Sequence, residues 1–357
     1  MFDSYMFNSE TVNIVISTLS SYSTTLTIII ALALDLILGE AKKYHYLVGF
    51  GWLTQHVESI LNPDCSNIKN SNKNSSTLEK PDEKTSKFSF KSASLGGLSW
   101  TILVCPIPII YLYYDNDLIW YYQVILDALV LYLAIGLVSL EQHAMQVYRP
   151  LKSGDLTTAR HFTGYLVSRE TSELTPNDMA RATTESMLEN GHDSVIASLL
   201  YYIVGGAPLV IIHRLANTLD AMWGYRTPRY NAFGYVSARL DDVLGFVSGK
   251  VCTLLYAIQG NFLKSIKNAY LQGNAYKSHN GGWVMAAGAT VLNRTLGGSA
   301  NYHGKKMTSV TLGTGATVTL NDIPSSIIII KRAALILLLL SMVWETTPFL
   351  TLFISSL

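Results

Sequence analysis

Apolar residues along the chain gather in long runs separated by polar stretches. The first three runs are Tyr22–Leu38, Leu95–Tyr114 and Leu118–Leu140. Each run, with a few flanking residues, approaches the roughly 20 residues that a helix needs to cross about 30 Å of hydrocarbon. Pro106 and Pro108 in the second run would kink a helix, but membrane helices tolerate proline. These runs therefore predict transmembrane helices.

A fourth apolar segment, Ser194–Ile212, departs from this simple pattern. Gly205-Gly-Ala-Pro208 interrupts it, and several arginines follow it. A simple crossing would place those arginines outside the cell, against the preference of basic residues for the cytoplasm. We therefore predict a broken, re-entrant or paired segment, with Val243–Ile258 as a candidate for the return.

The distribution of basic residues predicts the orientation of the spans. The connection around Asp115–Asp117 has no lysine or arginine, so it is expected outside the cell, with the flanking loops in the cytoplasm. The last apolar block, Ala333–Leu357, follows two basic residues and predicts a final span that starts on the cytoplasmic side. Residues 62–91 are dominated by polar side chains and predict a disordered cytoplasmic loop. The segment Glu141–Asp193, which contains several arginines, predicts a cytoplasmic helical region.

Composition supports a membrane protein. Hydrophobic residues make up 49% of the chain and charged residues 14%, whereas soluble domains average about 25% charged. A net charge of +1 provides no basic field for nucleic acid, so nucleic acid is not expected as a partner. Residues 1–23 lack the features of a cleaved secretory signal, so the first run is expected to remain as a span. The predicted fold is a single all-α domain over residues 1–357, a polytopic integral membrane protein whose cytoplasmic-side helices and loops form the site.

Standard catalytic motifs do not identify the chemistry. The chain has no Walker phosphate loop, no dinucleotide fingerprint and no G-x-S-x-G or H-E-x-x-H motif. The three cysteines form no C-x-x-C pair, and the histidines show no metal-ligand spacing. Charged and amide side chains are instead concentrated between Arg169 and Tyr302. Such residues are costly beside a membrane, so they mark a functional site by default.

The first such stretch places Arg181, Glu185 and Glu189 four residues apart, on one face of a helix. Two carboxylates on one face are suited to Mg²⁺. The alternative is a solvated helix face with ordinary ion pairs. Asn190 and Asp193 follow just before an apolar segment, which favours a site at the membrane surface.

The second stretch, residues 217–230, concentrates an amide, a carboxylate, two arginines and two tyrosines around a turn. These residues are Asn217, Asp220, Tyr225, Arg226, Arg229 and Tyr230. Arginine forks match phosphate and carboxylate oxygens, so Arg226 and Arg229 are predicted to clamp an anionic substrate. The alternative is a positive-inside anchor with interfacial tyrosines.

A third group supplies more carboxylates and glycines. Arg239 precedes Asp241 and Asp242, which on a helix point about 100° apart, so we expect one to ligate an ion and the other to support it. The segments Asn280–Trp283 and Leu296–Tyr302 each contain a Gly-Gly pair, whose backbone N–H groups are candidates for cradling phosphate. Plain turns are the alternative.

These stretches resemble the adenosylcobinamide-phosphate synthase family of cobalamin biosynthesis, often called CobD/CbiB, whose members are polytopic membrane proteins. The resemblance covers most of the chain. It is closest in three motifs that occur in order: N-T-L-D at Asn217–Asp220, G-Y-R-T-P-R-Y at Gly224–Tyr230, and A-R-L-D-D at Ala238–Asp242.

The resemblance implies an ATP-dependent amide ligase, with ATP and Mg²⁺ as cofactors, that joins the corrinoid adenosylcobyric acid to aminopropanol or aminopropanol phosphate. Such chemistry needs a metal to bridge phosphates, cationic donors and a proton acceptor for the attacking ammonium. The resemblance also implies a multi-pass protein of the cell inner membrane, with the lipid bilayer and other cobalamin biosynthesis enzymes as partners.

The resemblance further assigns roles to individual residues. Catalytic roles are implied for Glu185, Glu189, Asp193, Asp220 and Arg226, and metal ligation for Asp241, Asp242 and Glu185. Substrate binding is implied for Arg181, Asn190, Asn217, Tyr225, Arg229, Tyr230, Arg239, Asn280, Trp283 and Asn301.

The chain also departs from the family pattern. Tyr46, Ser198 and His279 stand where proline is usual, and Met285 stands where glutamate is usual. If that glutamate is catalytic in the family, this chain would be slow, altered in substrate or inactive. One alternative function is therefore a non-catalytic sensor or scaffold like the AmpE-type proteins. Another is a transporter, which explains polar residues at a broken helix but not their clustering outside the spans.

Overall fold

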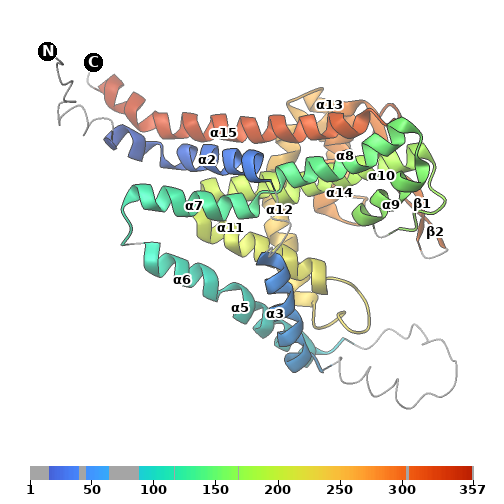
Figure 1. Ribbon diagram of the computed structural model, residues 1–357, viewed down its shortest axis with the longest axis horizontal. Coiled ribbons are helices and arrows are strands. Elements are labelled where there is room, and N and C mark those ends of the chain that lie inside the picture. The colour runs from blue at the N-terminus through green and yellow to red at the C-terminus, as the bar shows by residue number, and fades with distance from the viewer. Residues whose placement is uncertain are drawn as a thin grey trace.

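The computed structural model describes residues 16–39, 46–63, 88–115, 117–167, 169–302 and 305–355. This part of the chain is mostly helical, which confirms the predicted class (Figure 1). The helices are α2 (Ser23–Leu38), α3 (Tyr46–Leu61), α5 (Phe90–Val104), α6 (Pro106–Asp115), α7 (Trp120–Ala134), α8 (Leu137–Ser153), α9 (Leu156–Leu166), α10 (Pro176–Gly191), α11 (Ala197–Trp223), α12 (Tyr235–Ala257), α13 (Phe262–Asn268), α14 (His279–Leu292) and α15 (Asp322–Ser355), with single π-helical segments η1 (His192–Ile196) and η2 (Ala269–Gly273). The predicted disordered loop at 62–91 falls mostly outside the described residues.

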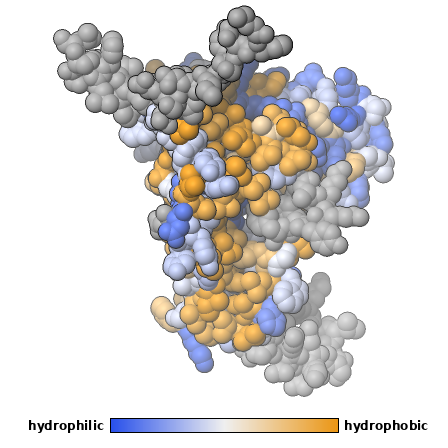
Figure 2. All heavy atoms as spheres, turned by 60° about the vertical axis from the view of Figure 1, so that its left-hand side comes forward, coloured by the Kyte–Doolittle hydropathy of each residue, from blue (hydrophilic) through white to orange (hydrophobic). Residues whose placement is uncertain are grey.

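The protein is an integral membrane protein. Among the described residues, four helical stretches are long and apolar enough to cross a membrane: Phe90–Asp115, Trp120–Ser153, Pro176–Trp223 and Asp322–Thr347. The shorter apolar helix α2 packs against α7 and α15. Figure 2 shows hydrophobic side chains covering much of the face that comes forward, with hydrophilic side chains gathered at the right-hand edge. The predicted apolar runs thus correspond to α2, α5 with α6, α7, α11 and α15.

The ends of these helices lie where the charge pattern requires. The start of α2, the end of α6, the start of α7 and the end of α15 lie at one end of the molecule (Figure 1). Helices α9 and α10 and the small sheet lie at the opposite end. This arrangement agrees with the prediction that the connection near Asp115 and the loops that flank it face opposite sides. The basic residues predict that the end with α9 and α10 faces the cytoplasm, and on that prediction we call it the cytoplasmic end.

Helix α11 contains the break that the sequence predicts. Gly205 and Gly206 leave the helical conformation, and Gly206 adopts φ 63°, a conformation that strains residues with a Cβ. The ring of Tyr201 lies 5.0 Å from the ring of His213, although twelve residues of straight helix would rise about 18 Å. The two halves of α11 therefore fold back on each other. We call this re-entrant element the α11 hairpin.

The α11 hairpin confirms that this segment is broken and folds back, but it corrects the predicted return. The returning half is residues 207–223 of the same element. The candidate return, Val243–Ile258, instead belongs mostly to α12, which runs across the long helices and packs against α11 and α14 (Figure 1). Sequence periodicity could not separate these cases, because both segments are apolar and of similar length.

A half-buried carboxylate fixes the α11 hairpin within the helix bundle. Tyr202, on the entering half, donates a hydrogen bond to Asp127 Oδ2 of α7 at 2.8 Å. Tyr111 of α6 donates to the other oxygen of the same carboxylate. Because an ionisable group inside a membrane helix is costly unless it is paired, Asp127 ties three helices together.

A small sheet accompanies the helices of the cytoplasmic end. Strand β1 (Arg294–Tyr302) pairs antiparallel with β2 (Lys305–Gly313) and parallel with the short β3 (Ala316–Thr317), in the order β2-β1-β3. The expected glycine turn at Leu296–Tyr302 is therefore a strand, with a bulge between Leu296 and Gly298. The other expected turn, Asn280–Trp283, lies in the first part of α14. Both expectations of a phosphate-binding loop are thus corrected.

Candidate functional site

The polar motifs gather around two cavities. The first cavity has a volume of about 330 Å³ and is lined by α2, the α7–α8 junction, α10, η1 and the returning half of α11. Its polar lining includes Asp35, His143, Asn190, Asp193, Ser194, Arg214 and Asn217. In a continuous helix, Asp193 and Asn217 would lie about 36 Å apart. The reversal in the α11 hairpin brings them to one cavity.

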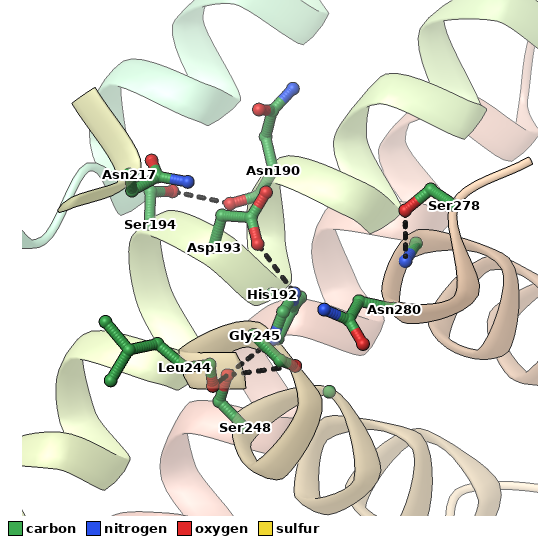
Figure 3. Close-up of polar contacts among 12 residues, drawn as sticks. Asn190, His192, Asp193, Ser194, Asn217, Leu244, Gly245, Ser248, Ser278 and Asn280 are labelled. Carbon is green, nitrogen blue, oxygen red and sulfur yellow. Dashed lines mark hydrogen bonds and ion pairs between the residues drawn. The ribbon is translucent and has the colours of Figure 1, made fainter. Parts of the chain in front are cut away.

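Asp193 is held in place by a buried histidine. His192 Nδ1 lies 2.7 Å from Asp193 Oδ1, and His192 Nε2 lies 2.8 Å from the hydroxyl of Ser248 (Figure 3). Ser248 is also 3.1 Å from the carbonyl oxygen of Leu244, to which it can donate. Both ring nitrogens of His192 are therefore engaged, and the ring holds the Asp193 carboxylate against α12.

Amide side chains connect this cavity to α12. Asn190 donates to the carbonyl of Ser186 at 2.9 Å, and the hydroxyl of Ser194 donates to the carbonyl of Asn190 at 2.7 Å. Asn217 donates to Asp241 Oδ1 at 3.4 Å, a long hydrogen bond. The returning half of α11 thus places Asn217 between the first cavity and the carboxylates of α12.

Three carboxylates, Asp193, Asp220 and Asp241, influence one another. Burial, followed by the nearby charges of Asp193 and Asp220, raises the pKa of Asp241 to about 7. Helix α12 is not among the described helices that are apolar enough to span the membrane. A carboxylate with this pKa is suited to accept a proton near neutral pH. Asp242, the next residue, lines the second cavity instead, as expected for neighbours on a helix.

The structure divides the predicted metal ligands. Among the described residues, no group of three His, Cys, Asp or Glu side chains could hold a metal ion. Mg²⁺ usually keeps several waters and takes one or two carboxylates plus substrate phosphates. Asp220 and Asp242, which interact electrostatically, fit such a partly open site. Glu185 does not join them, because it contacts Arg169 Nη2 at 2.7 Å and the Gly297 N–H at 2.7 Å.

Arg181, Glu185 and Glu189 share one face of α10, but their side chains contact different parts of the protein. Arg181 pairs with Asp178 at 2.9 Å, one turn earlier. Glu189 lies against the backbone of Gly281 near the start of α14, where a Cβ on the glycine would be 2.4 Å from Glu189 Oε1. A carboxylate at a helix N-terminus is electrostatically favourable. In the same turn, Asn280 donates to the carbonyl of Asp242 at 3.0 Å and joins α14 to α12.

The second cavity, of about 240 Å³, lies where the chain leaves α11 and enters α12. Its lining includes Phe88, Gly224, Tyr225, Arg226, Tyr230, Asn231, Tyr235, Arg239 and Asp242. Arg229 is not part of it. Arg229 instead pairs with the buried Glu58 of α3 at 2.6 Å, and the Tyr230 hydroxyl reaches the same carboxylate at 3.4 Å. The expected clamp of Arg226 with Arg229 is therefore corrected, because Arg229 anchors the loop to α3.

Trp283, a predicted binding residue, lies outside both cavities. It donates from Nε1 to Asn274 at 2.7 Å and carries the Lys250 ammonium over its ring. Asn301, another predicted binding residue, belongs to β1, where its backbone is in register with Lys306.

Three of the departures from the family pattern, at Ser198, His279 and Met285, lie outside the linings of both cavities. Met285 is 1% exposed and belongs to the hydrophobic core, so its missing carboxylate removes no group from either lining. Ser198 is buried in the entering half of the α11 hairpin, with its hydroxyl 3.2 Å from the Ser194 carbonyl. His279 is exposed at the start of α14.

Sequence reasoning missed Arg214 as a cavity residue. Arg214 is one of the arginines that follow the glycine break, and it precedes Asn217 by three residues. This spacing places both side chains on one helix face, so the sequence could have indicated that Arg214 lines the same cavity. Asp35, near the end of α2, also lines the first cavity and accepts a hydrogen bond from the Val138 N–H at 3.0 Å. No sequence signal singled out Asp127 or Glu58.

Comparisons with known proteins agree with the geometry. A family model described as CobD/Cbib protein matches residues 28–330. The chain is 38% identical over 311 residues to the cobalamin biosynthesis protein CobD of Chromobacterium violaceum, covering 85% of this chain and 91% of that protein. It is 38% identical over 296 residues to the protein of the same name from Stutzerimonas stutzeri, covering 82% and 89%. The counterpart from Halalkalibacterium halodurans is 36% identical over 219 residues, covering 59% and 69%. No solved structure matches the chain.

Proposed function

Because the chain belongs to the CobD/CbiB family of cobalamin biosynthesis, we propose that it is the ATP-dependent amide ligase which that resemblance implies. It joins the carboxylate of adenosylcobyric acid to the amine of aminopropanol or aminopropanol phosphate. The protein works in the cell inner membrane, with the reacting groups at the cytoplasmic end.

The reaction sets clear chemical requirements. An amide forms from a carboxylate and an ammonium only if one carboxylate oxygen leaves and the nitrogen loses protons. Cleavage of ATP supplies the phosphoryl group that carries the oxygen away. One proton is released overall for each amide formed. The site must therefore hold two anions together, orient an ammonium and accept a proton.

The first cavity provides groups for the carboxylate and the amine. Arg214 and Asn217 are placed to bind the corrinoid carboxylate, since a guanidinium and an amide both donate to carboxylate oxygens. Asp193, oriented by His192, is placed to bind the ammonium. Asp241, with a pKa of about 7, is the proton acceptor in this proposal.

Asp220 and Asp242 are the residues that would hold Mg²⁺. The ion, when bound, would neutralise phosphate charge and polarise the phosphoryl group. Its remaining ligands would be phosphate oxygens and water, as is usual for magnesium. Glu185 and Glu189 have a supporting role here, because Glu185 is bound to Arg169 and to the Gly297 N–H, and Glu189 lies against Gly281 of α14.

One observation carries this proposal: the α11 hairpin gathers Asp193, Arg214 and Asn217 in a single cavity beside Asp241. A non-catalytic sensor is less favoured, because the departure at Met285 lies in the core. A transporter is less favoured because Asp241 and Asp242 lie on α12, outside the candidate spans.

The direct test is an assay of the purified, detergent-solubilised protein. Adenosylcobyric acid, ATP, Mg²⁺ and either aminopropanol or aminopropanol phosphate are supplied, and the amide is sought by mass spectrometry. The Chromobacterium violaceum relative serves as a parallel sample. We expect an amide with one of the two amines. If the relative forms product and this chain forms none, the ligase proposal is wrong.

A further inference from the structure

The second cavity is lined by aromatic and cationic side chains, to which the proposed reaction has so far given no role. The rings of Phe88 and Tyr235 meet edge to face, 5.3 Å apart. The Arg239 guanidinium lies over the Tyr235 ring at 5.4 Å. Tyr225 and Tyr230 contribute further rings to the same lining. Flat aromatic faces beside cations are suited to a ligand that has both a π-system and negative charge.

The start of α12 adds a positive pole to this cavity. The helix runs for 23 residues from Tyr235, and no side chain caps its N-terminus at Gly234. Gly234, Tyr235 and Ala238 line the cavity, so the first turn of the helix faces it. The Tyr235 N–H already bonds to the Ala232 carbonyl, but the positive end of the helix dipole still favours anions at this cavity, phosphates above all.

Arg226 contributes a cation from the loop that enters this cavity. It is exposed, and within the described part of the chain it forms no ion pair. Arg239, by contrast, lies 3.6 Å from Asp242, with both side chains largely exposed. Such an exposed pair is weak, so Arg239 can exchange Asp242 for a phosphate oxygen at little cost.

Two carboxylates lie at or beside this cavity. A Cβ on Gly224 would lie 2.1 Å from Asp220 Oδ1, so only glycine lets the loop approach that carboxylate so closely. Asp242 lines the cavity directly. Asn217 lines the first cavity and Gly224 the second, seven residues or about 10 Å later along α11. Asp220 therefore lies on α11 between the two cavities.

We infer that the second cavity binds the nucleoside triphosphate, with its base against the aromatic rings and its phosphates toward Arg226, Arg239 and the first turn of α12. This inference rests on the proposed ligase function and assigns its substrates to separate places. The corrinoid carboxylate and the amine occupy the first cavity, and the phosphates reach them past Asp220. Aminopropanol phosphate and an anionic lipid headgroup share the phosphate chemistry but offer no base to the rings.

Nucleotide binding can be measured without any corrinoid. The purified protein, in a neutral detergent with Mg²⁺, is titrated with ATP that carries a fluorescent N-methylanthraniloyl group. We expect Arg226→Ala and Arg239→Ala each to weaken binding by about tenfold, as loss of a charge-assisted hydrogen bond implies. Tyr225→Ala should weaken it as well, through the lost ring. Lys264→Ala, which removes an exposed cation from α13, is the matched control and should leave binding unchanged.

Competition separates the three phosphate sources. Unlabelled ATP should displace the fluorescent nucleotide, whereas aminopropanol phosphate and phosphatidylglycerol at equal concentrations should not. Displacement by either of those two as strong as that by ATP would overturn the inference. Equal nucleotide affinity in the wild type and both arginine variants, all with unchanged melting temperatures, would overturn it too.

The outcomes also distinguish this inference from the proposed function. If amide forms but the arginine variants change only the KM for the corrinoid, the nucleotide assignment fails and the ligase stands. If the arginines control nucleotide binding but no amide forms, the cavity assignment stands and the ligase reaction fails. Asn217→Ala, in the first cavity, should leave nucleotide affinity unchanged, and a tenfold loss there would contradict separate cavities.

Discussion

Tyr201 and His213 pack ring against ring at 5.0 Å because the chain reverses between them at Gly205 and Gly206. This contact shows that the two halves of the apolar segment, separated by the glycine break, pack against each other as a hairpin. The reversal returns the N-T-L-D motif to the level of Asp193. The site therefore depends on a backbone break at least as much as on any single side chain.

Substitution at the break should open the site. Gly206→Val forces a β-branched side chain into the left-handed region, which costs about 1–3 kcal/mol. We expect a lower melting temperature in detergent and a larger loss of ligase activity. Gly49→Ala on α3, where an added Cβ meets nothing within 4 Å, is the matched control. A Gly206→Val protein that melts and reacts like wild type would argue against the strained turn.

The anchor at Asp127 should be needed for stability. Asp127→Ala leaves the hydroxyls of Tyr111 and Tyr202 without their shared acceptor, at a cost of about 1–3 kcal/mol for each buried group. We expect reduced melting temperature and more rapid proteolysis. Asp117→Asn, in the connection between α6 and α7, should have no comparable effect. Equal stability of the two variants would show that Asp127 does not hold the α11 hairpin.

Glu185 should behave as a structural residue. Removing its charge leaves the Arg169 guanidinium, which is 7% exposed, without its ion-pair partner, and breaking such a buried pair costs about 3–5 kcal/mol. We expect Glu185→Gln to lower the melting temperature while the folded fraction keeps its KM for nucleotide and its pH profile. An unchanged melting temperature with a loss of kcat would return Glu185 to the catalytic residues.

The pH dependence of stability should reveal Asp241. Its pKa is raised to about 7 in the folded protein from an ordinary value of 3.8, mainly by burial. Between these pH values the folded state binds more protons than the unfolded state, so stability falls as pH rises through this window. In EDTA, Asp241→Asn should therefore raise the melting temperature at pH 8 relative to wild type, and the difference should shrink toward pH 4. A difference that is independent of pH would show that Asp241 titrates normally.

The pH dependence of kcat should also reveal the ionisation of Asp241. If the Asp241 carboxylate accepts the proton, kcat should fall as pH drops through its pKa, which lies below about 7 with Mg²⁺ bound, because the ion offsets the charges of Asp220 and Asp242 that help to raise it. Asp241→Asn should remove this acid limb together with most of the activity. An acid limb that persists in the variant would assign the proton acceptor to another residue.

Much of the fold was accessible from the apolar pattern. The runs at α2, α5 with α6, α7 and α15 were located because lipid selects for length and apolar composition, which are local properties. The returning half of the α11 hairpin could not be located in this way, because the apolar pattern does not show which of two apolar segments packs against the first half. The sheet at 294–317 was missed because Gly297 and Gly298 form a bulge within a strand, whereas glycine pairs usually indicate turns.

The site was predictable in composition but only partly in arrangement. The motifs gave Asn217, Asp220 and Asp241, and the structure places these in one region. Motif membership could not show that Arg229 pairs with Glu58, because that partner lies on α3, 171 residues earlier. It could not show either that Glu185 binds Gly297. Long-range partners of this kind leave no local pattern.

Cross-linking across the α11 hairpin tests the central claim most directly. Ser194 and Asn217 line the same cavity, whereas 23 residues of continuous helix would separate them by about 35 Å. Cysteines at these two positions, in a background with Cys65, Cys105 and Cys252 replaced by serine, are treated in membranes with a short bifunctional thiosulfonate. Trypsin cleaves after Arg214, so an internal bridge leaves two peptides joined in the mass spectrum. The re-entrant hairpin predicts that joined pair, and its absence, with both cysteines singly labelled, would mean that α11 runs straight and the site is not assembled.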